Sequence, residues 1–443
     1  MGLRFLKIKK KINNFNKHIF VDGDKSLSIR WALIASQAIG QSTATNLLKS
    51  EDVLNTLNCL KKLGIKIKLT KKNCIIKGRG INGFIFKKNL VLNAGNSGTL
   101  GRLILPLLIK SPYKIKIIGD KSLSKRDFSR VIDPLKRIGV NFYPRNKKNL
   151  PIYIKGSNFL RPISYFERRG SAQCKSCVML AVLNTPGEIL ITAKKSRDHT
   201  ERMFQNLGIP MKIKKGKKLD FIKISKPEII NNINFKIPGD ISSCAFFIVL
   251  TLLSKNSKLV IKNININPSR IGLIKILNKM GAKIKLINIK NYKGEECADI
   301  FVKSSKSLKG INCPIDLNSS AIDEFLIIFL AASKAKGISY FKNLSELNEK
   351  ESPRLKIASK ILKMMGIKII SNNHSIKIYG NPNLKLNNEY IIKNYLKDHR
   401  VFMMCVIAAL SLGGNWKIFD PDSIKTSFPS FLNIVKKLGG KFN

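Results

Sequence analysis

Residues 60–67 of this chain read LKKLGIKI, and this stretch contains the joint from which the fold can be worked out. Its first half has the apolar spacing of a helix, and its last residues alternate as those of a half-buried strand do. Gly64 lies between them and suits the left-handed residue that closes many helices, because glycine lacks a Cβ. The stretch therefore predicts a helix that ends at a glycine and passes directly into a strand.

The same joint occurs six times in the chain. Its glycines lie at positions 64, 139, 208, 281, 366 and 439, so the intervals are 69–85 residues. Such an interval is longer than the common solenoid repeats and can hold a compact α/β unit with several strands and two helices. Any α/β protein has some joints of this kind, but six at near-regular spacing favour a repeat. A break near Pro238 separates three copies from three, and a second candidate hinge lies near Asp22, which predicts two lobes of similar build.

The length and composition are those of a globular protein. The chain has 443 residues, of which 44% are hydrophobic, enough for a large core and for two or three domains. It contains no long uncharged apolar run that could span a membrane. Residues 1–17 are basic but lack the apolar segment and the cleavage site of a secretory signal. We therefore expect a soluble, cytoplasmic protein without a membrane partner.

The charge balance is extreme, with 81 lysines and arginines against 27 acidic residues and a formal net charge of +54. Nucleic-acid binding, an anionic small substrate and a genome-wide bias toward lysine, isoleucine and asparagine are competing explanations. The lysines are scattered along the whole chain, no RNA- or DNA-binding motif is present, and aromatic residues do not interleave with basic ones as a stacking surface requires. We attribute most of the excess to composition and expect no specific nucleic-acid partner.

The cysteines and histidines give no metal or disulfide pattern. Cys174 and Cys177 form a C-x-x-C pair, but a zinc site needs two further ligands, and no second pair or nearby His-x-x-x-His is present. A redox motif is the alternative, although the pair lies in an apolar, helix-like run that ends at Leu183. The sequence favours two small core residues on a helix, and we expect no metal ion.

Residues 93–102 read NAGNSGTLGR, a concentration of glycines, hydroxyls and amides that ends in an arginine. Glycines let a backbone approach a ligand closely, and free N–H groups at a helix start attract an anion. The segment predicts either a cradle for an acid or a phosphate, or a turn that only caps a helix. The apolar residues 103–108 that follow are expected to form the body of that helix.

Further basic turns precede other expected helices. Cations at a helix start oppose the helix dipole, so their presence favours a bound anion, although a solvated basic face is the plainer alternative. These cations are Lys25, Arg126, Lys350, Arg354 and Arg400. Asp323 and Glu324 open the apolar run 325–332, where two acids would serve either as helix caps or as acid–base groups.

In order along the chain, these segments resemble the signature blocks of the 5-enolpyruvylshikimate-3-phosphate (EPSP) synthase family. The family's blocks include D-K-S-x-S-x-R, S-R-D-H-T-E and K-E-S-D-R-L, and ten blocks match in order and spacing over nearly the whole chain. The matching segments are residues 24–30, 95–99, 119–126, 171–176, 196–201, 238–243, 323–324, 350–355, 398–400 and 427–429. Residues 51–53, Lys175 and residues 183–187 look closer to the second class of the family.

The resemblance implies the enolpyruvyl transferase fold, an α/β (α+β) architecture in which two domains form an inside-out α/β barrel. Each domain has three βαβαββ repeats, in agreement with the six glycine joints. The first lobe would span residues 22–238, and the second would combine residues 1–21 with residues 239–443. The site is implied to lie in the cleft between the lobes.

The resemblance implies transfer of the enolpyruvyl group of phosphoenolpyruvate to the 5-hydroxyl of shikimate 3-phosphate, with release of phosphate, on the shikimate pathway to chorismate and the aromatic amino acids. Both substrates are small polyanions, which accounts for the cation-rich motifs. No metal or organic cofactor is implied, and the family's usual form is a monomer.

Roles for individual residues also come from the resemblance. Asp323 would take the proton of the 5-hydroxyl with Lys350 nearby, Glu351 would exchange a proton with the methylene carbon, and Lys25 would touch both substrates. The residues implied for shikimate 3-phosphate are Lys25, Ser26, Arg30, Ser171, Ala172, Gln173, Ser196, Arg197, Asp323 and Lys350. Those implied for phosphoenolpyruvate are Lys25, Gly98, Arg126, Gln173, Arg354 and Arg400.

Two positions depart from the family pattern. Pro353 stands where an acid usually precedes the arginine, and proline fixes φ and lacks an N–H, so we expect some disturbance of the turn around Glu351 and Arg354. Asp127 stands where proline is usual, and its carboxylate would weaken the hold of Arg126 on a phosphate. Neither change removes a catalytic residue, so we expect an active enzyme.

Two other functions compete with this interpretation. The sister transferase that acts on UDP-N-acetylglucosamine shares the fold but uses a loop cysteine as its acid, and residues 119–126 contain no cysteine. The non-enzyme alternative is a basic nucleic-acid-binding protein. A phosphate-release assay distinguishes all three.

Overall fold

The computed structural model describes residues 4–443, which divide into two compact units. Unit 2 comprises Gly23–Ile237 together with the short segment Tyr292–Glu295. Unit 1 comprises the described residues up to Asp22, then Pro238–Asn291 and Glu296–Asn443. The chain therefore begins in unit 1, builds most of unit 2 as one continuous segment, and then returns to unit 1.

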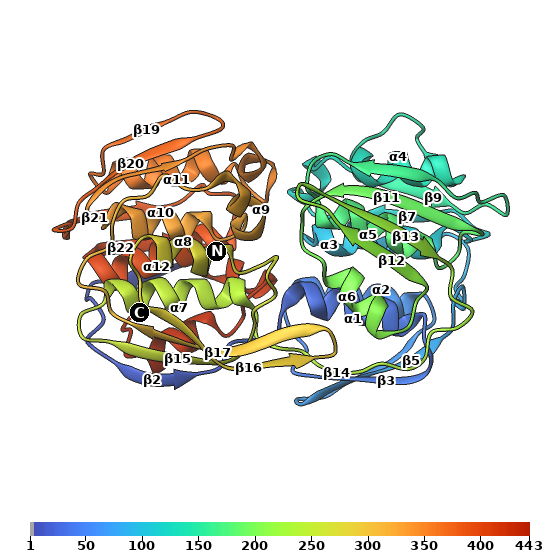
Figure 1. Cartoon of the computed structure of the whole chain (residues 1–443), viewed down its shortest axis with the longest axis horizontal. Coiled ribbons are helices and arrows are strands. Elements are labelled where there is room, and N and C mark those ends of the chain that lie inside the picture. Colours follow the sequence, from blue (N-terminus) through green and yellow to red (C-terminus); the bar gives the residue numbers. More distant parts are fainter. Residues whose placement is uncertain (1–3) are drawn as a thin grey trace. The chain divides into compact units, whose positions relative to one another are not determined.

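Unit 2 contains three four-stranded sheets of one topology (Figure 1). In each sheet the first two strands are parallel, and the other two run antiparallel to their neighbours. In hydrogen-bonding order the sheets are β14 (Asn234–Lys236), β3 (Ile39–Thr45), β5 (Asn73–Arg79), β4 (Lys66–Leu69); β6 (Val91–Asn93), β7 (Ile115–Ile118), β9 (Ile152–Lys155), β8 (Asn141–Tyr143); and β10 (Ser164–Glu167), β11 (Glu188–Lys194), β13 (Leu219–Ser225), β12 (Met211–Lys215).

Two α-helices accompany each of these sheets. They are α1 (Lys25–Ser36) and α2 (Glu51–Lys62), α3 (Gly98–Leu103) and α4 (Ser129–Ile138), and α5 (Ala172–Ala181) and α6 (His199–Asn206). Helices α1 and α5 are buried along most of their length, because most of their side chains are apolar or small, and each also buries one cation, Arg30 on α1 and Lys175 on α5. A sheet with two helices thus recurs three times, which is the repeat that the glycine joints predicted.

Unit 1 contains three further sheets, two of which take a strand from the start of the chain (Figure 1). They are β16 (Ile284–Tyr292), β17 (Glu295–Lys303), β15 (Lys258–Asn265), β2 (Asn16–Ile19); β18 (Gly337–Phe341), β20 (Ile376–Gly380), β19 (Ile369–Ser371); and β1 (Phe5–Ile8), β22 (Gly413–Phe419), β21 (Leu386–Ile392). The first and third sheets each contain a parallel pair, β15 with β2 and β21 with β22. The second sheet has parallel bridges from Lys309 and Asn312 where a fourth strand would lie.

The core of unit 1 is formed around three helices whose side chains are almost all buried. These are α7 (Ile241–Leu253), α10 (Phe325–Ser333) and α12 (His399–Leu412). The remaining α-helices are α8 (Gly272–Lys279), α9 (Asn318–Ala321), α11 (Arg354–Met364) and α13 (Phe431–Lys437). The start of each long buried helix carries polar residues, and these are the residues that form the candidate site described below.

The predicted helix ends are confirmed at all six glycines, and a strand follows five of them, but residues 440–443 after Gly439 form no strand. All six glycines have a positive φ, between +69° and +114°, where a side chain would be strained. Two of them are also closely packed, because a Cβ at Gly64 would lie 2.5 Å from the carbonyl oxygen of Ile85, and one at Gly139 would lie 2.5 Å from that of Phe159. At Gly208 a Cβ would meet nothing within 4 Å, so only the backbone conformation requires glycine.

The helix expected over residues 103–108 is wrong in its bounds. The α-helix α3 begins at Gly98 and ends at Leu103, and the apolar residues Leu105–Leu108 form a short 3₁₀ helix. Pro106 lacks the N–H that an α-helical hydrogen bond would need, which explains the change of helix type. The glycine-rich stretch therefore provides the helix itself and not only the turn before it.

The eight cysteines are all buried and free. Cys174 and Cys177 lie on α5 within the core, as the core interpretation of the C-x-x-C pair predicted. Among residues 4–443, no three or more histidine, cysteine or acidic side chains are grouped as metal ligands would be. Within the same range, no helix combines the length and the apolar character needed to cross a membrane.

Candidate active site

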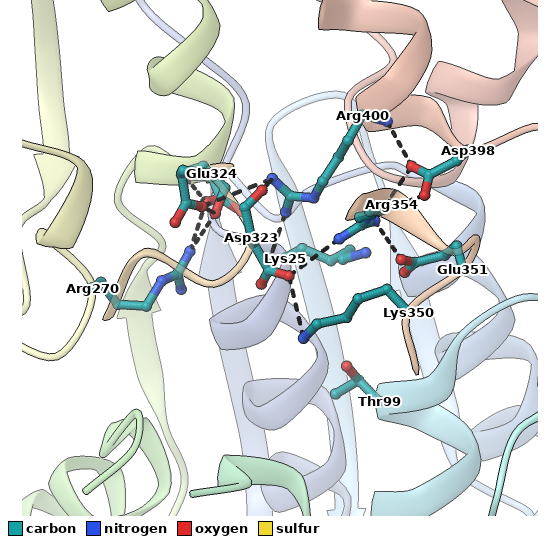
Figure 2. Close-up of polar contacts among 12 residues, drawn as sticks. Lys25, Thr99, Arg270, Asp323, Glu324, Lys350, Glu351, Arg354, Asp398 and Arg400 are labelled. Atoms are coloured by element: carbon teal, nitrogen blue, oxygen red, sulfur yellow. Dashed lines mark hydrogen bonds and ion pairs between the residues drawn. The ribbon is translucent and has the colours of Figure 1, made fainter. Parts of the chain in front are cut away.

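In unit 1, Asp323 is surrounded by three cations (Figure 2). Its Oδ1 lies 3.5 Å from Nζ of Lys350 and 3.4 Å from Nη1 of Arg354. Arg400 approaches from another helix, with Nη1 donating a 2.8 Å hydrogen bond to the backbone carbonyl of Asp323. A carboxylate held among three cations is well placed to accept a proton transiently from a bound hydroxyl.

Arg354 is the buried centre of this cluster. Only 1% of its side chain is exposed, and its Nε donates a 2.9 Å hydrogen bond to Asp398. Burial lowers the pKa of Arg354, but the carboxylates of Asp398, Glu351 and Asp323 overcome this effect and raise it. Burial likewise opposes ionisation of Asp398, but the charge of Arg354 prevails and holds the pKa of Asp398 below its ordinary value. The pair is therefore ionised at neutral pH.

Glu351 lies at the edge of the same cluster. Its carboxylate accepts a hydrogen bond from Nη2 of Arg354, three residues along the chain (Figure 2). The side chain is less buried than those of Arg354 and Asp398, with 22% of it exposed. A partly exposed carboxylate beside a fixed guanidinium can bind a proton from solvent and deliver it to a bound molecule.

A second polar network holds Glu324. Ser242 donates a hydrogen bond to the Glu324 carboxylate, and Arg400 lies 3.8 Å from it. Arg270, which is 1% exposed, donates to Ser242 at 2.9 Å and to Asp240 at 3.0 Å. These contacts fix the side chains that surround Arg400.

Three helix starts bring these residues together. Asp323 and Glu324 immediately precede α10, Arg354 is the first residue of α11, and Asp398 caps α12 by accepting a hydrogen bond from the N–H of Arg400 at 2.9 Å. Helix N-termini carry partial positive charge, so three of them add to the attraction for an anion. Pro353 occupies the position before α11 with φ −71°, within the range that the proline ring fixes.

In unit 2, the start of α1 presents the first set of predicted residues. Asp24 caps the helix, its carboxylate accepting the N–H of Leu27 at 2.9 Å. Lys25 forms an ion pair with Asp52 at 3.0 Å. Ser26 follows in the first turn and is half-buried, and its carbonyl accepts a 3.2 Å hydrogen bond from Arg30.

Arg30 connects α1 to α5 and α6. Its Nε donates to Thr200 at 2.8 Å, and its Nη2 donates to Ser176 at 3.1 Å. The two hydroxyls are also 2.7 Å apart. Arg30 is therefore held rigidly inside unit 2, with 4% of its surface exposed.

The start of α3 brings two guanidinium groups close to Gly98. A Cβ at this position would lie 3.0 Å from Nη1 of Arg102 and 3.0 Å from Nη1 of Arg126. Arg126 is held by Asn96, whose Oδ1 accepts a 2.8 Å hydrogen bond from Nη2. The segment thus combines a glycine with converging cations, an arrangement suited to a phosphate or carboxylate.

Asp127 is bound to residues at the start of α4. Its carboxylate accepts hydrogen bonds from the N–H of Ser129 at 2.8 Å and from the Ser129 hydroxyl at 2.6 Å, and Arg130 lies 3.8 Å away. Burial raises the pKa of Asp127, but the bonds from Ser129 outweigh it and the pKa is lowered. The carboxylate stabilises the start of α4.

The start of α5 holds Ser171, Ala172 and Gln173. Ser171 caps the helix by accepting the N–H of Cys174 at 3.3 Å. The Gln173 amide is fixed at both ends, with Arg102 donating to its oxygen at 2.6 Å and its nitrogen donating to Thr99 at 3.0 Å. Burial lowers the pKa of the Arg102 guanidinium to about 10, so it stays charged at neutral pH.

Ser196 and Arg197 lie in the loop before α6, and both are half-buried. The Ser196 hydroxyl is buried without a hydrogen-bond partner among residues 4–443. A buried polar atom of this kind is costly unless something binds it, so it is a candidate ligand contact.

A comparison with models of known protein families shows the family to which this chain belongs. Residues 9–435 match the family model described as EPSP synthase (3-phosphoshikimate 1-carboxyvinyltransferase). The chain belongs to the EPSP synthase family.

Individual relatives agree with this membership. A 3-phosphoshikimate 1-carboxyvinyltransferase of Petrotoga mobilis is 40% identical over 428 residues, which cover 96% of this chain and 97% of that protein. The structure of an EPSP synthase from Acinetobacter baumannii has a TM-score of 0.86 at 33% identity and covers 99% of both chains. The enolpyruvyl transferase NikO from Streptomyces tendae, at 14% identity, has a TM-score of 0.77 and covers 100% of this chain and 99% of its own. The fold is the enolpyruvyl transferase fold.

The signature blocks of the EPSP synthase family predicted most of the residues in these contacts. Two residues were missed as members of the site: Asp398, which holds Arg354, and Asp52, which pairs with Lys25. Both lie in segments that already carried the resemblance, so an acid within such a segment is the signal that could have found them. Arg102, in the glycine-rich stretch, serves the structure by fixing Gln173.

Proposed function

We propose that this chain transfers the enolpyruvyl group of phosphoenolpyruvate to the 5-hydroxyl of shikimate 3-phosphate and releases inorganic phosphate. The observation that carries the proposal is membership of the EPSP synthase family over residues 9–435. The clusters of fixed cations at helix starts support it, because both substrates are polyanions and guanidinium groups bind carboxylates and phosphates through paired hydrogen bonds.

For shikimate 3-phosphate, the proposed ligands in unit 2 lie at the starts of α1, α5 and α6. The first helical N–H groups of α5 are suited to a phosphate, and Arg30 crosses behind them to Ser176. The proposed residues are Lys25, Ser26, Arg30, Ser171, Ala172, Gln173, Ser196 and Arg197 in unit 2, and Asp323 and Lys350 in unit 1.

For phosphoenolpyruvate, arginines supply most of the proposed contacts. Arg354 and Arg400 are held in fixed directions by Asp398 and by the carbonyl of Asp323, so little side-chain freedom is lost on binding. The proposed residues are Lys25, Gly98, Arg126, Gln173, Arg354 and Arg400.

The chemistry needs one proton acceptor and one proton shuttle. We assign the first role to Asp323: its carboxylate accepts the 5-hydroxyl proton as that oxygen bonds to C2 of phosphoenolpyruvate. Glu351 donates a proton to the methylene carbon, which gives a tetrahedral intermediate. As the bond from C2 to the phosphate oxygen breaks, Glu351 takes a proton back from the resulting methyl group, and the proton held by Asp323 passes to the leaving phosphate. Lys25 and Lys350 stabilise the negative charge of the substrates during both steps.

The other features that we propose follow the family resemblance. The two lobes span residues 22–238, and residues 1–21 with 239–443, each with three repeats. The enzyme works as a monomer in the cytoplasm, without a metal or organic cofactor and without a specific nucleic-acid partner. Eight free, buried thiols suit a reducing compartment.

A coupled phosphate-release assay on the purified protein tests the activity. We expect phosphate only when phosphoenolpyruvate and shikimate 3-phosphate are both present, and unchanged rates after dialysis against EDTA. Asp323→Asn removes the proton acceptor and should lower kcat by about 10²–10⁴-fold. Asp316→Asn is the matched control, because Asp316 is exposed and belongs to no proposed role.

The outcomes separate the alternatives. Phosphate release with UDP-N-acetylglucosamine in place of shikimate 3-phosphate would indicate the sister reaction. No release with either acceptor, from a folded protein, would contradict the proposed function. Size-exclusion chromatography with light scattering measures the oligomeric state, and cell fractionation measures the location.

A further inference from the structure

Glu167, the last residue of β10, is an acid enclosed by its own loop. It is 2% exposed and has no place in the catalytic proposal. Its carboxylate accepts three backbone N–H groups in succession, from Arg169 at 3.1 Å, Gly170 at 2.6 Å and Ser171 at 2.9 Å. Three hydrogen bonds from consecutive residues to one carboxylate fix the backbone conformation of the loop between β10 and α5.

A buried cation stabilises this carboxylate. Lys175 on α5 is 1% exposed and pairs with Glu201 on α6 at 2.5 Å. The charge of Lys175 also favours the ionised form of Glu167, as do the three N–H groups, although burial prevails and raises the pKa of Glu167. Two acids and one lysine thus join the end of β10 to α5 and α6 inside unit 2.

The loop contacts also determine which groups at the start of α5 remain for a ligand. The N–H of Ser171 is bound to Glu167, and the Ser171 oxygen accepts the N–H of Cys174. The N–H groups of Ala172 and Gln173, in the first turn, have no hydrogen-bond partner among residues 4–443. Two backbone donors and the hydroxyl proton of Ser171 therefore stay available for an anion.

We infer that Glu167 is a positioning residue for the phosphate of shikimate 3-phosphate, acting through the loop 168–171 and the start of α5. This inference rests on the proposed function for the identity of the ligand. In this role Glu167 does not contact the phosphate. Its carboxylate binds the backbone N–H groups of the loop, and the positive charge of Lys175 offsets its negative charge. The ion pair of Lys175 with Glu201 extends the same support to α6, whose preceding loop carries Ser196 and Arg197.

The first test needs no variant and no substrate. Hydrogen exchange of the intact protein, followed at the amides of Arg169, Gly170 and Ser171, should show slow exchange for a loop that is otherwise exposed at Arg168 and Arg169. Exchange at the rate of an unstructured loop would overturn the inference.

The second test compares Glu167→Gln with Glu188→Gln. Glutamine keeps the size of the side chain but offers one acceptor oxygen, so at least one of the three N–H groups loses its partner. Glu188 is a control in the same sheet, because its ion pair with Lys223 is at the surface, with 34% and 56% of the side chains exposed.

For Glu167→Gln we expect faster exchange at residues 169–171 and a KM for shikimate 3-phosphate raised about ten-fold, with the KM for phosphoenolpyruvate within about two-fold of the parent. Glu188→Gln should change neither. Equal losses for both substrates, or a raised KM without faster loop exchange, would contradict a positioning role. If the parent protein released no phosphate, the proposed function would fail, whereas the exchange measurements would still report on the loop.

Discussion

At the scale of single residues, the most consequential contact is the buried pair of Arg354 and Asp398 in unit 1. Neither side chain has more than 1% of its surface exposed, so each charge depends on the other. Removing one partner of a buried pair leaves the other charge without compensation in a poorly solvated place. Without Asp398, Arg354 would still contact Glu351 and Asp323, which limits the loss of stability. Its guanidinium would then no longer be held in its present direction.

Asp398→Asn should therefore lower the free energy of unfolding by about 3 kcal/mol at pH 7. The pKa of Asp398 lies below its ordinary value of 3.8, so the ionised carboxylate stabilises the fold at any pH above about 3.8. That contribution is lost as the pH falls through the lower, folded-state pKa. Urea titrations of both proteins at pH 7 and in acid should thus show a difference that shrinks in acid, and a constant difference would contradict the assignment.

Glu351→Gln should leave folding almost unchanged and lower kcat by about 10²–10⁴-fold, because glutamine cannot exchange a proton with the methylene carbon. The amide oxygen can still accept a hydrogen bond from Arg354, so the melting temperature should stay close to that of the parent. Steady-state phosphate release measures the effect. Glu349→Gln, at an exposed position two residues earlier, is the control.

Much of the candidate site could be predicted from the sequence, because the family blocks hold residues that act together at helix starts. Contacts between distant segments could not. Asp398 meets Arg354 only because α11 and α12 pack side by side in the core. Local spacing carries no information about this arrangement.

At the scale of elements, the glycine joint was the most dependable signal. A helix that must stop and turn into a strand needs a residue with positive φ, and this local requirement appears directly in the sequence. The helix over residues 103–108 was misjudged because an apolar run does not distinguish an α-helix from a 3₁₀ helix, and Pro106 decides between them.

Two of the joint glycines form a matched pair of test sites. Gly208→Ala should cost about 1–2 kcal/mol, the strain of a side chain in the left-handed region, since its Cβ would meet nothing within 4 Å. Gly139→Ala should cost more, because its Cβ would collide with the Phe159 carbonyl at 2.5 Å. Chemical denaturation of the two variants measures both costs, and equal costs would show that the close approach at Phe159 relaxes freely.

At the scale of the whole molecule, the dominant feature is the net charge of +54. Repulsion among so many surface cations opposes the compact state, and salt screens it. The screening length falls from about 30 Å at 0.01 M salt to about 8 Å at 0.15 M. The melting temperature should therefore rise over this range of sodium chloride concentration, and a fall or no change, measured by circular dichroism, would contradict this account.

The order of the strands has a consequence for how the protein is made. Domains generally fold as units while the ribosome is still adding residues, and unit 2 is nearly complete once Ile237 has emerged. At that moment the pairing partners of the first two strands have not been synthesised: β15, which pairs with β2, and β22, which pairs with β1 near the end of the chain. Both are open edges that could pair with a neighbouring nascent chain, and Lys7 and Lys17 place a charge on each of them, a feature that discourages such pairing.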